Sequence, residues 1–246
     1  MTTSPIESWD EIAEWWRSEV ADDPLFDEQV RPLLDELLPR EVDYALDLGC
    51  GEGRLLPLLA RRADVAVGVE EAPRLARWAV ERGPVVRAIL PRLDWVRDGT
   101  IALAVAVYVL DLLDDAGTFF VETARVVRPG GFLVVVVNHP VFTPDDAAPV
   151  VDADGEVLWR WGGYFATGVS DQPAGERTVR FHHRPLGVLL TEAAQAGWCL
   201  ETLVEVPLGP GTVARHPGYR GQEQIPRILA VRWRRTDSRN PPGTPM

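Results

Sequence analysis

The chain has 246 residues, of which 25 are basic, 37 are acidic and 4 are histidine, so its formal net charge is -12 at pH 7. Its length suits one α/β domain, and its 46% of hydrophobic residues excludes a disordered composition. All 25 basic residues are arginine, which excludes Schiff-base chemistry and a lysine-dependent phosphate loop. An acidic chain without lysine is also a poor candidate for binding nucleic acid or an anionic membrane surface.

The cysteines and the apolar runs point to a cytoplasmic protein. Cys50 and Cys199 form neither a metal-binding spacing nor a disulfide framework, which is typical of a reducing compartment. The N-terminus lacks the basic-then-apolar pattern of a secretory signal. The longest apolar runs, 101–110 and 132–137, are far shorter than the ~20 residues of a membrane helix.

The predicted elements begin with two helices, over 9–20 and about 25–38. Ser8 and Glu11 form a capping box at the start of the first helix. We assign residues 1–40 to an N-terminal helical lid.

From residue 41 on, apolar runs of strand length alternate with helical patterns. The predicted strands are 44–48, 65–69, 85–90, 101–110 and 132–138, and the predicted helices between them are 54–62, 73–82 and 119–127. A helix over 186–196, a strand over 199–206, a loop over 207–226 and a last strand over 228–233 follow. This alternation predicts right-handed βαβ crossovers and a doubly wound, mostly parallel α/β sheet with helices on both faces.

The regular pattern breaks between residues 141 and 181. This stretch is rich in Pro, Gly and Asp, and it contains the aromatic residues Trp159, Trp161, Tyr164 and Phe165. Because a loop of this length inside a compact domain is usually functional, we expect an aromatic-rich lid inserted at 141–181. The main domain then covers 41–235, and 236–246 is expected to be a disordered tail.

A glycine-rich motif, Asp47-Leu48-Gly49-Cys50-Gly51-Glu52-Gly53, lies between the first predicted strand and its helix. Three glycines in five residues favour a loop whose backbone approaches a nucleotide-type ligand at the carboxyl end of the sheet. The G-x-G-x-G spacing differs from the dinucleotide fingerprint, G-x-G-x-x-G. Asp47 would also repel a pyrophosphate, so a cationic ligand is favoured there.

The string from Leu46 to Gly53 resembles the first motif of the class I S-adenosylmethionine-dependent methyltransferases, bacterial small-molecule type. Three downstream pieces agree: Glu70 after the second strand, Asp98-Gly99-Thr100 before the fourth, and Arg125-Val126-Val127-Arg128-Pro129-Gly130-Gly131 before the fifth. The resemblance covers about 44–138. It implies a seven-stranded Rossmann-like sheet with an antiparallel last strand. It also implies S-adenosylmethionine as cofactor and S-adenosylhomocysteine as its product.

The resemblance further implies roles for individual residues. Gly49 and Gly51 would let the backbone meet the methionine moiety, Asp47 would lie near its amino group, and Glu70 would accept hydrogen bonds from the ribose. The complete expected cofactor-binding set is Asp47, Gly49, Gly51, Gly53, Glu70, Glu71, Asp94, Trp95 and Tyr108. The sequence departs from the family pattern at Ala102, where Asp is common, and at Asp111, where many relatives have His.

The acceptor is expected at the ends of the fourth and fifth strands. The expected substrate-binding residues are Trp16, Asp111, Trp159, Trp161, Tyr164, His182 and Arg184. His139 and His183 are the candidate catalytic bases, because a hydroxyl or amine acceptor benefits from a base that titrates near neutral pH. A carboxylate acceptor would need no base, and Arg184 would orient it. The adjacent histidines lack a third ligand at a suitable spacing, so no metal site is expected.

The sequence therefore predicts methyl transfer from S-adenosylmethionine to a small-molecule acceptor, with O- or N-methylation favoured and the acceptor left open. The alternative is a cofactor-binding regulator, or a cyclase-type protein on the same fold, without methyl transfer. We expect no nucleic-acid or membrane partner, and a monomer or homodimer.

Overall fold

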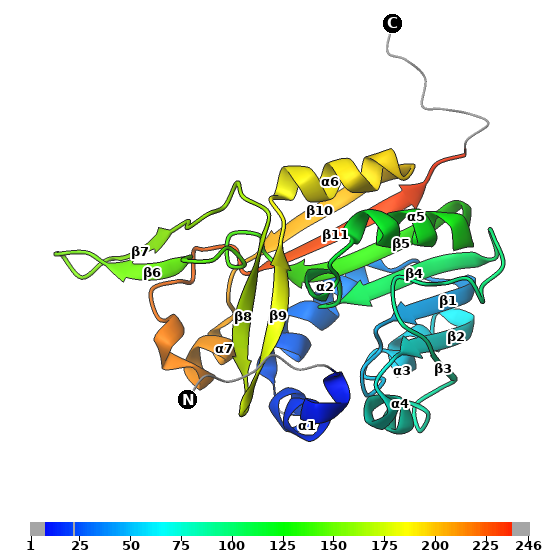
Figure 1. The fold of residues 1–246 in the computed structure, drawn as a ribbon, viewed down its shortest axis with the longest axis horizontal. Coiled ribbons are helices and arrows are strands. Elements are labelled where there is room, and N and C mark those ends of the chain that lie inside the picture. The colour runs from blue at the N-terminus through cyan, green and yellow to red at the C-terminus, as the bar shows by residue number, and fades with distance from the viewer. Residues whose placement is uncertain (1–7, 22, 238–246) are drawn as a thin grey trace, which may run out of the picture.

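The computed structural model describes residues 8–21 and 23–237. Its centre is a seven-stranded sheet with the order β10-β11-β5-β4-β1-β2-β3 (Figure 1). The strands are β1 (Val42–Leu48), β2 (Ala63–Glu70), β3 (Val85–Arg87), β4 (Ile101–Val107), β5 (Val127–Asn138), β10 (Trp198–Val206) and β11 (Ile228–Arg235). The first five are parallel to one another, and β11 is antiparallel to both β5 and β10. The expected α/β fold with an antiparallel last strand is confirmed.

Helices cover both faces of the sheet, which explains why β4 and most of β5 are buried along their length. On one face, α5 (Ala116–Val126) and α6 (Leu186–Gln195) enclose a core with residues of β5, β10 and β11 (Figure 1). On the other, α2 (Arg31–Leu37) and α3 (Leu56–Leu59) pack on β1, β4 and β5. α4 (Pro73–Ala79) contacts β2 and β3.

Several expected elements differ in length from the prediction, and the three around β2 differ as follows. The helix expected over 54–62 is only α3, because the glycine-rich loop continues in turns through residue 55. The helix expected over 73–82 ends at Ala79. The strand expected over 85–90 is a three-residue edge strand, β3, which pairs only with the last residues of β2.

The expectation of an irregular lid at 141–181 is wrong in its secondary structure, because two antiparallel hairpins form there. They are β6 (Ala148–Val151) with β7 (Val157–Arg160), and β8 (Gly168–Ala174) with β9 (Arg177–His183). Gly175, at φ +61, occupies the tight turn of the second hairpin, a conformation that favours glycine. The Asp, Gly and Pro residues in these strands interrupt the alternation that would have predicted them.

The loop expected over 207–226 also contains regular structure, namely α7 (Pro210–Arg215) and a short 3-10 turn, Pro217–Tyr219. Of the expected tail, only residues 236 and 237 lie within the described residues. Within the described part of the chain, no helix combines the length and the apolar character needed to span a membrane.

The N-terminal segment packs against the second hairpin. It consists of a 3-10 turn, Trp9–Ile12, and α1 (Ala13–Ala21), and it begins at the expected capping box of Ser8 and Glu11. Ile12 is buried against Ala174 and Val179 of that hairpin. A π-helical turn, Phe26–Val30, then leads directly into α2.

The core on the α5 face provides a stability prediction. Phe120 is fully buried, with its ring 5.6 Å from Phe119 and 5.5 Å from Trp233. We expect Phe120→Ala to lower the free energy of unfolding by about 3–5 kcal/mol, because a large cavity replaces the ring. The matched control is Val121→Ala on the exposed side of the same helix, which should change it by less than about 0.5 kcal/mol. Equal denaturation midpoints for the two variants would contradict this packing.

Candidate functional site

A cavity of about 240 Å³ opens at the carboxyl edge of the parallel strands. It lies where the strand order reverses between β4 and β1, the position at which open α/β sheets bind ligands. Its wall is formed by the glycine-rich loop after β1, the carboxylates that end β2, the residues after β4, and the N-terminal helices. The expected site residues on this wall are Trp16, Asp47, Gly49, Gly51, Glu70, Glu71 and Tyr108.

The three glycines of the loop serve different purposes. All have positive φ: 72° at Gly49, 56° at Gly51 and 82° at Gly53. A Cβ at Gly49 would lie 2.5 Å from Val109, and one at Gly53 would lie 3.0 Å from Ala79. These two positions are therefore closed by packing, and Gly53 does not line the cavity. At Gly51 the nearest neighbour of a Cβ would be Trp16 Nε1, 3.9 Å away. A side chain at this position would therefore occupy space in the cavity, and glycine leaves that space open.

Glu70 connects the end of β2 to the glycine-rich loop. Its carboxylate is buried and accepts hydrogen bonds from the Gly51 and Ala72 amides, at 2.9 and 2.8 Å. Burial raises the pKa of Glu70, and these two N–H groups oppose that shift. The carboxylate is thereby fixed at the cavity wall, where each oxygen retains a further lone pair for a ligand.

Asp47 is the least satisfied carboxylate of the site. It is 3% exposed, and its Oδ2 has no hydrogen-bond partner among the described residues. Burial first, and then the neighbouring charges of Glu70 and Glu52, raise its pKa to about 8. A buried carboxylate without a partner is unfavourable unless something neutralises it. A cationic group in the cavity would do so.

The N-terminal segment closes the cavity on its other side. The rings of Trp9 and Trp16 meet edge to face with centroids 5.4 Å apart, and both line the cavity. Arg54, directly after the glycine-rich loop, donates to the Val20 carbonyl at 2.8 Å and lies 4.0 Å over the ring of Phe26. One arginine thus connects the loop to the helices that cover it.

Tyr108 occupies an unusual conformation at the end of β4. Its φ is +57°, which is uncommon for a bulky residue and concentrates at functional sites. Its side chain lines the cavity, while its hydroxyl is buried without a hydrogen-bond partner in the described chain. Burial raises the pKa of this hydroxyl, so it remains protonated.

Asp111 lies just beyond Tyr108 and does not line the cavity. Its Oδ2 accepts hydrogen bonds from the backbone and side-chain amides of Asn138, at 3.1 and 3.2 Å. Burial raises the pKa of Asp111 to about 6, against the opposing effect of these bonds. The carboxylate joins the ends of β4 and β5.

The expected catalytic bases, His139 and His183, lie outside the cavity and are hydrogen-bonded to other residues. His139 is buried, with Nε2 2.7 Å from Glu205 and Nδ1 accepting the Val141 amide at 3.2 Å. His183 is also buried, with Nδ1 2.6 Å from the Thr143 hydroxyl and Nε2 donating to the Tyr164 carbonyl at 2.8 Å. Burial lowers the pKa of both imidazoles. Both ring nitrogens of each are engaged, and neither histidine lines the cavity.

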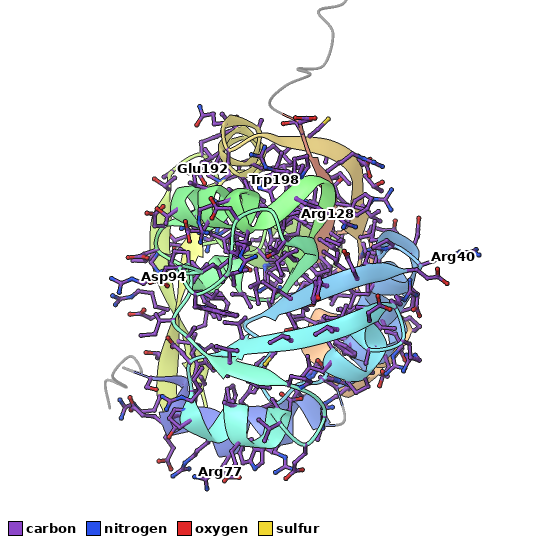
Figure 2. The ribbon with its side chains drawn as sticks, turned by 90° about the vertical axis from the view of Figure 1, so that its right-hand side faces the viewer. Arg40, Arg77, Asp94, Arg128, Glu192 and Trp198 are labelled. Carbon is purple, nitrogen blue, oxygen red and sulfur yellow. The ribbon has the colours of Figure 1, made fainter. Side chains whose placement is uncertain are left out.

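The remaining expected site residues are also separate from the cavity. Asp94 and Trp95 are exposed in the loop after β3, and Figure 2 shows Asp94 at the outer surface. Arg184 donates to the carbonyls of Leu110, Leu113 and Asp114, so it stabilises the turn after β4. The other residues outside the lining are Trp159, Trp161, Tyr164 and His182.

The cavity residues that were not expected from the sequence include Val20, Asp23, Phe26 and Arg54. The expected N-terminal lid indicated the region, but the side chains of a helix that face a distant loop depend on how that helix docks. Within the described chain, no cluster of three or more potential metal ligands occurs.

Residues 46–135 match the family model described as "Methyltransferase domain". The part of the chain from the end of β1 into β5 is therefore similar to the methyltransferase domain family. A solved methyltransferase from Mesorhizobium loti shares the fold, with a TM-score of 0.74 and 24% identity over 83% of this chain and 96% of that one.

Two curated proteins are similar over part of their length. An uncharacterized 37.1 kDa protein in transposon TN4556 of Streptomyces fradiae is 34% identical over 111 residues, 42% of this chain and 32% of that protein. The trans-aconitate 2-methyltransferase of an Azoarcus species is 34% identical over 115 residues, 44% of this chain and 46% of that protein. The chain thus matches less than half the length of either curated relative.

The raised pKa of Asp47 has a consequence for stability. Between its unfolded pKa of about 3.9 and its folded pKa of about 8, the native state holds a proton that the unfolded chain has lost. The free energy of unfolding should therefore fall with rising pH, by up to about 1.4 kcal/mol per pH unit from this residue. Urea unfolding at about pH 5 and about pH 7 measures this change. Between these two pH values the free energy of unfolding should fall less in Asp47→Asn than in the natural protein. Parallel pH dependences would mean that Asp47 is not a buried, protonated group.

Proposed function

We propose that the protein binds S-adenosylmethionine in this cavity and transfers its methyl group to a small-molecule acceptor. The observation that carries the proposal is the unpaired Asp47 carboxylate, buried beside a glycine that leaves the cavity wall open. These residues fit the cofactor, because its methionine moiety carries an ammonium group that would neutralise Asp47. The match of residues 46–135 to the methyltransferase domain model supports the same assignment.

The chain's own residues have distinct roles in this proposal. Asp47 binds the ammonium, and Gly51 lets the methionine moiety approach the backbone. Glu70 accepts hydrogen bonds from the ribose hydroxyls with the lone pairs that the Gly51 and Ala72 amides leave free. The bound cofactor supplies a methyl group already activated by a sulfonium. The protein therefore mainly needs to orient the acceptor and exclude water. Trp16 and the rest of the N-terminal wall perform the second task.

A matched pair of glycine substitutions tests the cofactor site. Gly51 and Gly99 both have positive φ, but only the Cβ of Gly51→Ala would project into the cavity. We expect Gly51→Ala to weaken binding of S-adenosylhomocysteine by about tenfold or more, as overpacking does. Gly99→Ala pays the same conformational cost and should bind normally. Calorimetry in which both variants bind equally well would place the cofactor elsewhere.

The N-terminal segment and the β8–β9 hairpin form the proposed lid. Trp9 and Trp16 line the cavity, and the hairpin supports them through Ile12. Hydrogen exchange should slow in both segments when S-adenosylhomocysteine binds, while α6 on the far side of the molecule stays unchanged. Unchanged exchange in the N-terminal segment at saturating ligand would argue against a lid.

Methyl transfer itself is tested with radiolabelled cofactor and a metabolite extract. Label transferred to a small molecule supports the proposal. Binding without transfer to any component would favour the regulatory or cyclase-type alternative, and absence of binding would overturn the proposal. His139→Ala and His183→Ala should retain the natural rate-pH profile, because neither imidazole lines the cavity.

A further inference from the structure

We propose that the acceptor is an amine on an apolar body, held by the Asp23 carboxylate and the aromatic wall of Trp16, Phe26 and Tyr108. This inference rests on the proposed function and names the chemical class of its acceptor. It follows from the charges on the cavity wall, from one carboxylate in particular, and from the side chains around it.

Negative groups dominate the cavity wall. Its carboxylates are Asp23, Asp47, Glu52, Glu70 and Glu71, and its one arginine is Arg54. That guanidinium is already occupied by the Val20 carbonyl, the face of Phe26 and the Asp27 carboxylate at 3.5 Å. A carboxylate acceptor would lose its hydration beside these acidic side chains, and the one arginine of the described lining is not free to replace it. The polycarboxylate in the name of the Azoarcus relative is therefore a poor fit here.

Asp23 is separate from the carboxylates of the glycine-rich loop. It lies between α1 and the π-helical turn, where its Oδ1 accepts the Leu25 amide at 3.0 Å. The side chain is half-buried, and no arginine among the described residues forms an ion pair with it. One carboxylate oxygen thus anchors the chain while the group as a whole faces the cavity as an uncompensated negative charge.

Tyr108 and the aromatic rings complete a site for a nitrogen. The hydroxyl of Tyr108 is buried without a hydrogen-bond partner among the described residues, and the charges of Arg227 and then Asp23 act on it. Trp16 and Phe26 line the same cavity. Aromatic faces attract cations, and a desolvated carboxylate needs one. Together these groups favour a protonated or methylated nitrogen over a neutral or anionic oxygen.

The charge of Arg227 also acts on the Tyr108 hydroxyl, but its guanidinium is engaged elsewhere. Its guanidinium lies 4.3 Å over Phe142 and 5.6 Å from the ring centroid of Tyr219. It does not line the cavity. An acceptor carboxylate could reach it only by displacing these rings.

Methyl transfer to an amine also gives Asp23 a task. The amine reacts as the neutral base, so an ammonium first gives one proton to the Asp23 carboxylate. The nitrogen lone pair then forms the N–C bond as the S–C bond breaks, and that bonding pair remains on sulfur. The methylated ammonium carries the product charge, and the proton on Asp23 passes to solvent.

The test uses three probes with one apolar body: 2-phenylethylamine, 2-phenylethanol and 3-phenylpropionate. Each is titrated by calorimetry into protein saturated with S-adenosylhomocysteine. We expect the amine to bind about tenfold or more tightly than the alcohol and the acid. Asp23→Asn should remove that preference, since the amide still accepts the Leu25 N–H but carries no charge. Glu36→Gln removes an exposed charge from α2 and should change nothing.

The outcomes separate this inference from the proposed function. Normal binding of S-adenosylhomocysteine with equal or stronger binding of the acid would overturn the amine assignment and leave the cofactor site standing. Failure of the amine to bind the loaded protein would do the same. An amine preference that survives in Asp23→Asn would overturn the role of Asp23. Failure to bind S-adenosylhomocysteine would overturn the proposed function and this inference together.

Discussion

Two carboxyl groups, those of Asp47 and Glu70, lie at the ends of neighbouring parallel strands. Among the described residues no arginine forms an ion pair with either of them. Asp47 is the next-to-last residue of β1 and is buried, and in the loop that follows it a Cβ at Gly49 would clash with Val109. Glu70, one strand away, accepts one hydrogen bond on each carboxylate oxygen from the backbone amides of Gly51 and Ala72. The negative charge of this edge is thus built in by the strand register, and the cavity beside it is where a positive group belongs.

The N-terminal helices depend on this edge for their position. Arg54 leaves the glycine-rich loop and holds the Val20 carbonyl and the Phe26 ring, so the loop and its cover are one connected unit. The β8–β9 hairpin supports that cover from outside through Ile12 and the ion pair of Arg177 with Glu11, at 2.6 Å. The glycine-rich loop, the N-terminal helices and the hairpin are therefore linked by direct contacts.

The sequence predicts the ligand edge well, because local rules determine it. Three glycines, an acid before them and an acid after the next strand specify a turn, a strand end and a charge, and the structure brings Asp47, Gly51 and Glu70 together at the cavity. The distant side chains could not be predicted in this way. His139 and His183 are polar residues in a suggestive sequence position, yet Glu205 and Thr143, far away in the chain, occupy their nitrogens. The position of Asp23 on the cavity wall depends on how its segment docks against the rest of the chain, which no local sequence pattern specifies.

The central claim is that the buried carboxyl group of Asp47 is protonated without a ligand and ionises when the ammonium group of the cofactor binds beside it. Calorimetry of S-adenosylhomocysteine binding at about pH 7, in two buffers with different ionisation enthalpies, counts the protons exchanged. Because Asp47 has a pKa of about 8 without a ligand, and a bound ammonium favours its ionised form, the account predicts release of close to one proton, which is lost in Asp47→Asn. Tight binding with no proton release would contradict it.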